Sequence, residues 1–109
     1  MLEMITSDGQ SVTVHTFKNA ESALNYLCEV VKNARDGRIN VDTATKSLVA
    51  GLRSIIGDRD GFSGSVWHSP AQSTESEIHE IVATFEKGMR TSDWGDWDSR
   101  IRQFRTNLR

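Results

Sequence analysis

The sequence is poor in cysteine and histidine, the residues that form disulfides or bind structural metal ions in small domains. Cys28 is the only cysteine among 109 residues, so no intramolecular disulfide can form. The three histidines lie in separate segments, and together with one cysteine they give no ligand spacing for a structural zinc site. We therefore expect neither a metal nor a cofactor, and the single thiol favours a reducing, cytoplasmic setting.

Long hydrophobic runs are also missing. No stretch approaches the roughly 20 apolar residues that span a bilayer, and the mean hydropathy is −0.47. The first four residues, Met-Leu-Glu-Met, contain neither the basic nor the apolar segment that begins a secretory signal. The sequence therefore predicts a cytoplasmic protein with no membrane association.

An excess of one charge is absent as well. The chain has 13 Lys and Arg residues against 15 Asp and Glu residues, a net charge of −2. Domains that bind nucleic acid usually carry a strong positive excess, so a nucleic-acid partner is not favoured. The charges are unevenly placed, however, because acids dominate residues 75–98 whereas residues 100–109 contain four arginines and no acid. This gradient matches the macrodipole of a C-terminal helix.

No enzyme motif is complete. Residues 58–61 begin like a calcium loop, but Phe62 stands at the fifth ligand position and the glycine of position six is missing. His79-Glu80 lacks the second histidine of a zinc-protease motif because Ala83 occupies its place. The Gly/Ser-rich stretch after residue 60 lacks the last glycine of a nucleophile elbow. We therefore predict that the protein is not an enzyme.

The N-terminal residues predict a β-hairpin over about residues 2–17. Two short runs of alternating residues flank Asp8-Gly9, a dipeptide that suits a two-residue type I′ turn. Such a turn would place Ile5 opposite Val12. A hairpin of two strands is marginal in water, so we expect it to pack on helices or to gain a third strand.

Four segments with helical periodicity follow the hairpin. The predicted helices cover about residues 20–36, 41–57, 74–90 and 93–108. Asn19 suits the N-cap of the first helix, and Thr74 with Glu77 has the form of a capping box at the start of the third. The predicted fold class is α+β and mainly helical, with one domain over residues 1–109.

The connection between the second and third predicted helices is unusually long. Residues 58–73 are rich in Gly and Ser and contain the only proline. A structureless connection of this length is uncommon inside a compact domain. The segment either holds a short third strand at residues 65–67 or forms a functional loop, and both alternatives stay open.

Tryptophan is concentrated toward the C-terminus. An aromatic seam of the last predicted helix recurs at spacings of three and four, and its members are Trp94, Trp97, Ile101, Phe104 and Leu108. The seam either packs within the fold or contributes the large rings that often dominate protein interfaces. The third tryptophan, Trp67, falls in the Gly/Ser-rich connection. We predict Trp67, Trp94 and Trp97 as partner-binding residues.

Arginines form a second feature of the last helix. Arg102, Arg105 and Arg109 recur at helical spacing as an arginine ridge, and Arg100 lies off that ridge. The ridge could follow phosphates of a nucleic acid. It could equally pair with the acidic face of the third helix, within the fold or across a dimer, and the negative net charge favours this pairing. We predict Arg102, Arg105 and Arg109 as partner-binding residues.

These features together predict a class of function rather than an activity. The leading hypothesis is a small, non-enzymatic interaction or accessory protein that binds another protein, as a regulator or inhibitor of that larger partner, and that forms a homodimer. The alternative is a nucleic-acid-binding transcriptional regulator that uses the arginine ridge.

Overall fold

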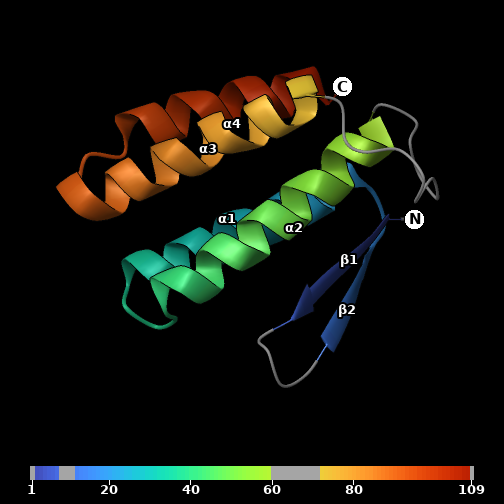
Figure 1. The fold of residues 1–109 in the computed structure, drawn as a ribbon, viewed down its shortest axis with the longest axis horizontal. Helices are drawn as coiled ribbons and strands as arrows, with labels where there is room; N and C mark the ends of the chain where they lie inside the picture. Colours follow the sequence, from blue (N-terminus) through green and yellow to red (C-terminus); the bar gives the residue numbers. More distant parts are fainter. Residues whose placement is uncertain (1, 8–11, 60–71, 109) are drawn as a thin grey trace. The chain divides into compact units, whose positions relative to one another are not determined.

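The structure is a computed structural model that describes the backbone of residues 2–7, 12–59 and 72–108, and the side chains of residues 14–57 and 75–108. Two strands precede four helices (Figure 1): β1 (Leu2–Ser7), β2 (Val12–Phe17), α1 (Ala20–Arg35), α2 (Val41–Arg59), α3 (Gln72–Thr91) and α4 (Gly95–Asn107). The prediction of a mainly helical α+β fold is confirmed. The chain divides into two compact units, residues 1–64 and 65–109, and each is described by itself. A single domain over residues 1–109 stays a prediction.

The register of the hairpin differs from the predicted one. β1 and β2 are antiparallel, and Ile5 lies opposite Val14 rather than Val12, which pairs with Ser7. The prediction was wrong because four residues, not two, separate the paired ends of the strands. A register shift of two residues does not exchange the two faces of a strand. Asp8-Gly9 itself lies outside the described residues, as does the candidate third strand at 65–67.

One face of β2 packs on α1. The ring centroid of Tyr26 lies 4.8 Å from that of His15 and 5.4 Å from that of Phe17. The Tyr26 hydroxyl lies 3.4 Å from His15 Nε2. Val14, whose side chain points to the opposite face because side chains alternate along a strand, is 55% exposed.

α1 and α2 lie side by side as an antiparallel helical hairpin (Figure 1). Asn19 caps α1 as predicted, because its Oδ1 accepts a hydrogen bond from the Ser22 amide at 2.9 Å. The buried apolar residues of the two helices recur at helical spacing: Ala23, Leu24, Leu27, Val30, Val31 and Ala34 on α1, and Ala44, Leu48, Leu52, Ile55 and Ile56 on α2.

α3 and α4 form a second antiparallel helical hairpin, in the C-terminal unit (Figure 1). α3 begins at Gln72, so Thr74 lies inside the helix and the predicted capping box is wrong. α4 begins at Gly95 with Trp94 at its N-cap, two residues later than predicted. None of the helices in the described ranges is both long and apolar enough to cross a bilayer.

The turn between α3 and α4 contains a strained residue. Ser92 has a φ of 63°, in the left-handed region that residues with a Cβ atom rarely adopt. Its amide donates to the Gly88 carbonyl at 2.8 Å, as expected for a left-handed residue that closes a helix. The Asp93 side chain then accepts from the Gly95 amide at 3.1 Å, which leads the chain into α4.

The backbone of Ser92 predicts a stabilising substitution. We expect Ser92→Gly to raise the free energy of unfolding by about 0.5–1 kcal/mol, because glycine adopts positive φ without steric cost. Gly37, at a φ of 76° after α1, is the matched control. Gly37→Ala should lower stability by about 1 kcal/mol. Urea denaturation monitored by circular dichroism measures both, and a destabilised Ser92→Gly variant would contradict the assigned turn.

Candidate functional site

The α3–α4 hairpin holds most of the predicted site residues around an aromatic core. Phe85 of α3 is fully buried, and Trp97 of α4 is only 5% exposed. Their ring centroids lie 6.2 Å apart with the planes at 64°, an edge-to-face arrangement. Trp97 is therefore packed within the hairpin, and its role as a partner-binding residue stays a prediction.

The ring of Trp94 packs against the backbone of Gly88. Its ring is half-buried, lies 6.1 Å from the Phe85 ring and covers the helical residue Gly88. A methyl group at Gly88 would come within 2.6 Å of the Trp94 ring, well inside the roughly 3.5–4.0 Å of carbon–carbon contact. The absence of a side chain at Gly88 thus makes room for the tryptophan that begins α4.

Two ion pairs connect the exposed surfaces of α3 and α4. Lys87 Nζ lies 2.5 Å from Asp96 Oδ2, and Arg100 Nη2 lies 2.7 Å from Glu80 Oε2. The hydrogen bond to Asp96 and the charge of its carboxylate raise the pKa of Lys87 above the ordinary lysine value. The stabilisation that this pair contributes is therefore present at neutral pH, and on the alkaline side it is lost as the pH rises through the elevated pKa of Lys87.

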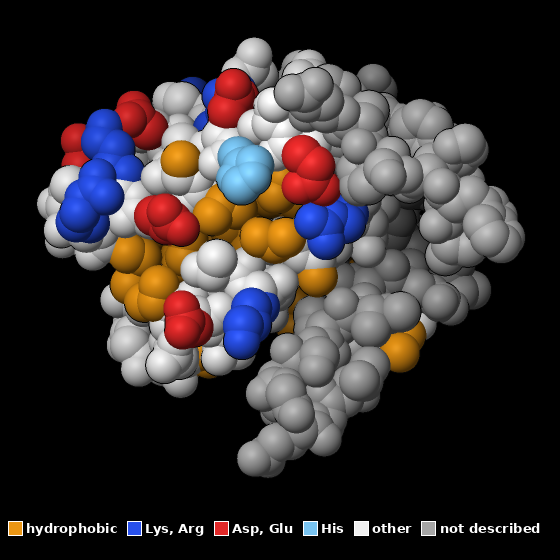
Figure 2. Space-filling view, viewed as in Figure 1, with side chains coloured by type: hydrophobic (Ala, Val, Ile, Leu, Met, Phe, Trp, Pro, Cys, Tyr) orange, Lys and Arg blue, Asp and Glu red, His pale blue; other side chains and the backbone are white. Residues whose placement is uncertain are grey.

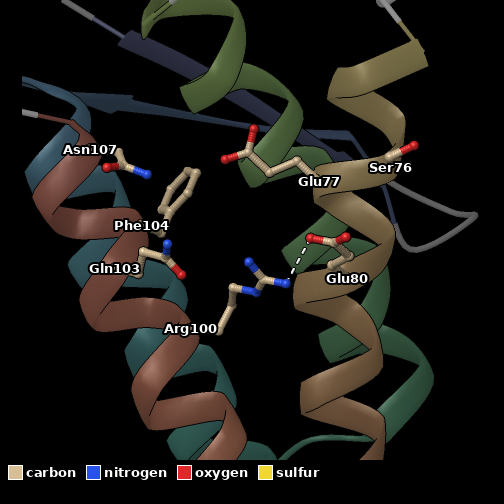
Figure 3. Close-up of a pocket in the computed structure, with 7 residues that line it drawn as sticks. All are labelled: Ser76, Glu77, Glu80, Arg100, Gln103, Phe104 and Asn107. Carbon is tan, nitrogen blue, oxygen red and sulfur yellow. Dashed lines mark hydrogen bonds and ion pairs between the residues drawn. The ribbon is translucent and has the colours of Figure 1, made fainter.

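A hollow of about 330 Å³ opens between α3 and α4 beside the second ion pair. It is lined by Ser76, Glu77, Glu80, Arg100, Gln103, Phe104 and Asn107. Figure 3 shows the carboxylates of Glu77 and Glu80 and the amides of Gln103 and Asn107 in the space between the two helices, with the Phe104 ring among them. We call this site the α3–α4 hollow.

The α3–α4 hollow offers both donors and acceptors of hydrogen bonds. Gln103 and Asn107 are exposed, and each side-chain amide can donate and accept at once. They stand four residues apart, which places them on one side of α4. Because a peptide group also presents one donor and one acceptor, this pair can bind the backbone of an extended segment.

The structure gives the predicted site residues different surroundings. Trp67 and Arg109 lie outside the described side chains. Arg102 is exposed, whereas Arg105 is half-buried and engaged in an interaction of its own. It is Arg100, the arginine off the ridge, that pairs with Glu80 of the acidic face. Sequence reasoning did not single out Gln103 and Asn107, although their spacing of four was a usable signal.

Charges of both signs are interspersed on the described part of one face of the molecule. On the face drawn in Figure 2, acidic and basic side chains alternate, and no basic stripe is visible over the described part of that face. Binding to phosphates benefits from several neighbouring cations. Over the described part of this one face, the mixture of charges differs from such a cluster.

Neither a cluster of metal ligands nor a similar protein helps to assign a function to the described structure. Within the described ranges, no three His, Cys, Asp or Glu side chains lie close enough together to hold a metal ion. The comparisons with protein families, with curated proteins and with solved structures found nothing that matches this chain.

Proposed function

We propose that this protein is a cytoplasmic, non-enzymatic interaction protein that acts as a homodimer and binds a segment of a larger protein, which it regulates or inhibits. The peptide-binding site in this proposal is the α3–α4 hollow. The observation that carries the proposal is the presence of two side-chain amides, Gln103 and Asn107, on one side of a groove between two helices.

The lining of the hollow supports binding of a peptide over binding of an apolar ligand. Phe104 is its one aromatic residue, and six polar or charged side chains surround it. Apolar ligands prefer sites lined mainly by hydrophobic groups with few polar ones. Backbone amides of a peptide, in contrast, need hydrogen-bonding partners when they lose water.

The Arg100–Glu80 pair supports a hollow of stable shape. The pair connects the two helices, with 2.7 Å between Arg100 Nη2 and Glu80 Oε2. The arginine side chain is 34% exposed and the glutamate side chain is 57% exposed. Exposed ion pairs contribute little to stability, but a charge-assisted hydrogen bond of this length restrains both side chains. A preorganised lining reduces the entropy that a bound peptide must offset.

Selection from a displayed library of randomised peptides, followed by calorimetry, tests this proposal. We expect selected peptides to bind the wild type, and the double variant Gln103→Ala, Asn107→Ala to bind them at least tenfold more weakly. The reason is that each lost hydrogen bond is worth about 0.5–1.5 kcal/mol, and a tenfold change in Kd corresponds to about 1.4 kcal/mol.

The matched control removes a side-chain amide from α1, outside the α3–α4 hollow. Asn25 is exposed on α1, and Asn25→Ala should leave the affinity unchanged. If the selected peptides bind the double variant as tightly as the wild type, the α3–α4 hollow is not the peptide site. If no peptide is selected at all, the proposed function itself is contradicted.

A further inference from the structure

The outer edge of β2 is an unpaired strand edge within the described structure. The sheet has two strands there, and β2 pairs with β1 alone. Each strand of a two-stranded sheet has a second edge whose backbone groups can pair with another strand. A sheet of two strands is also marginal in water, so further pairing stabilises it.

The helices of the N-terminal unit leave β2 as the more open of the two strands. β1 packs along α2 more extensively than β2 packs along α1. In the view of Figure 1, β1 lies between α2 and β2, so β2 is the strand farther from α2. Only one face of β2 is covered by the Tyr26 ring, and Val14 on the other face is 55% exposed.

The sequence of β2 lacks the residues that normally protect such an edge. Natural edge strands carry charges, above all lysine, or proline, which oppose pairing with another strand. β2 reads Val-Thr-Val-His-Thr-Phe and contains no Asp, Glu, Lys, Arg or Pro. Val, Thr and Phe also have high preference for strands. The strand is therefore suited to pairing along its open edge.

We propose that β2 pairs antiparallel with β2 of a second copy, so that two hairpins form one four-stranded sheet across a two-fold axis. This proposal rests on the homodimer of the proposed function and names its interface. A second copy fits because two identical strands without Asp, Glu, Lys or Arg meet with no repulsion between such charges. A two-fold axis also makes the contact self-complementary and closed.

Light scattering after size-exclusion chromatography tests the interface. The wild type should have a mass of about twice 12.2 kDa. Val14→Lys should have the mass of one chain, or a dimer dissociation constant at least tenfold higher, because it places two ammonium groups in the new sheet. The exposed position of Val14 allows the lysine in the monomer, and an unchanged circular dichroism spectrum verifies the fold.

The chain supplies a matched control. Val41, on α2, is the other exposed large hydrophobic residue among the described side chains, at 41% exposure. Val41→Lys should remain a dimer. A wild-type monomer overturns both this interface and the homodimer of the proposed function. A Val14→Lys variant that stays as dimeric as the wild type, or a Val41→Lys variant that dissociates equally, overturns the β2 interface alone.

A second readout covers the case in which Val14→Lys does not fold. Thr16 is exposed on the same face of β2, and Thr16→Lys should also dissociate the dimer. In a Cys28→Ser background, Val14→Cys should form a disulfide-linked dimer under mild oxidation, whereas Val41→Cys should not. A cross-link that forms equally from both positions contradicts the proposed pairing.

Discussion

Phe85→Ala is expected to lower the free energy of unfolding by about 3–5 kcal/mol, the largest loss among the single substitutions considered for this chain. Phe85 is fully buried, and its ring contacts those of both Trp94 and Trp97. Truncation to alanine removes the favourable free energy of burying the phenyl ring. It also leaves a cavity that the rings of Trp94 and Trp97 can fill only by moving. Typical stabilities are about 5–15 kcal/mol, so the variant should be close to unfolding.

Urea denaturation monitored by circular dichroism and by tryptophan fluorescence measures this loss. Val41→Ala serves as the control because Val41 is 41% exposed, and its truncation should change stability by no more than about 0.5 kcal/mol. A Phe85→Ala variant within about 1 kcal/mol of the wild type would show that the aromatic core of the α3–α4 hairpin is not packed as described.

Gly88→Ala is expected to destabilise the protein by about 1–2 kcal/mol, against the ordinary preference of helices. Alanine in a helix interior is normally more favourable than glycine by about 1 kcal/mol. At Gly88 the added methyl would overlap the Trp94 ring, and overpacking of this kind costs about 1–3 kcal/mol. The displaced ring would also lose its contact with Phe85.

The matched control is a second helical glycine with free space around it. Nothing lies within 4 Å of a Cβ atom built on Gly57, so Gly57→Ala should raise stability by about 0.5–1 kcal/mol. In a Trp94→Ala background, Gly88→Ala should likewise become stabilising. If Gly88→Ala stabilises the wild type as much as Gly57→Ala does, Trp94 does not rest on Gly88.

The helices were the most predictable part of the fold. Apolar residues of α1 and α2 recur at a spacing that only a helix converts into one buried face, so periodicity located both helices well. Asn19 was recognisable as a cap because its short side chain can reach the amide of Ser22. The ends of α3 and α4 were less predictable, since Thr74 and Asp93 have the chemistry of caps but take other positions.

The hairpin shows why strand register is harder to predict than strand position. A register shift of two residues leaves the same side chains on each face, so the alternation of apolar and polar residues cannot detect it. Asp8-Gly9 suggested a two-residue turn, but the pairing of Ser7 with Val12 fixes a longer connection. The residues of the turn therefore predicted the register of the hairpin less well than the pairing along both strands determines it.

The candidate site depended on tertiary information that the sequence does not contain. Periodicity grouped Trp94 and Trp97 in one seam, but it could not decide between packing and an interface, and it could not show that Gly88 makes the space for Trp94. Helical spacing grouped the arginine ridge, yet the arginine that pairs with Glu80 is Arg100. That choice depends on how α3 and α4 lie against each other, as do the residues that line the α3–α4 hollow.

An NMR titration of the ¹⁵N-labelled protein with a selected peptide tests the central claim most directly. We expect the side-chain NH₂ signals of Gln103 and Asn107 to shift, together with backbone amides of the residues of α3 and α4 that line the hollow. Signals of Asn25 should stay in place. Shifts confined to α1 and α2, or a peptide that binds without moving the amide signals of Gln103 and Asn107, would contradict binding in the α3–α4 hollow.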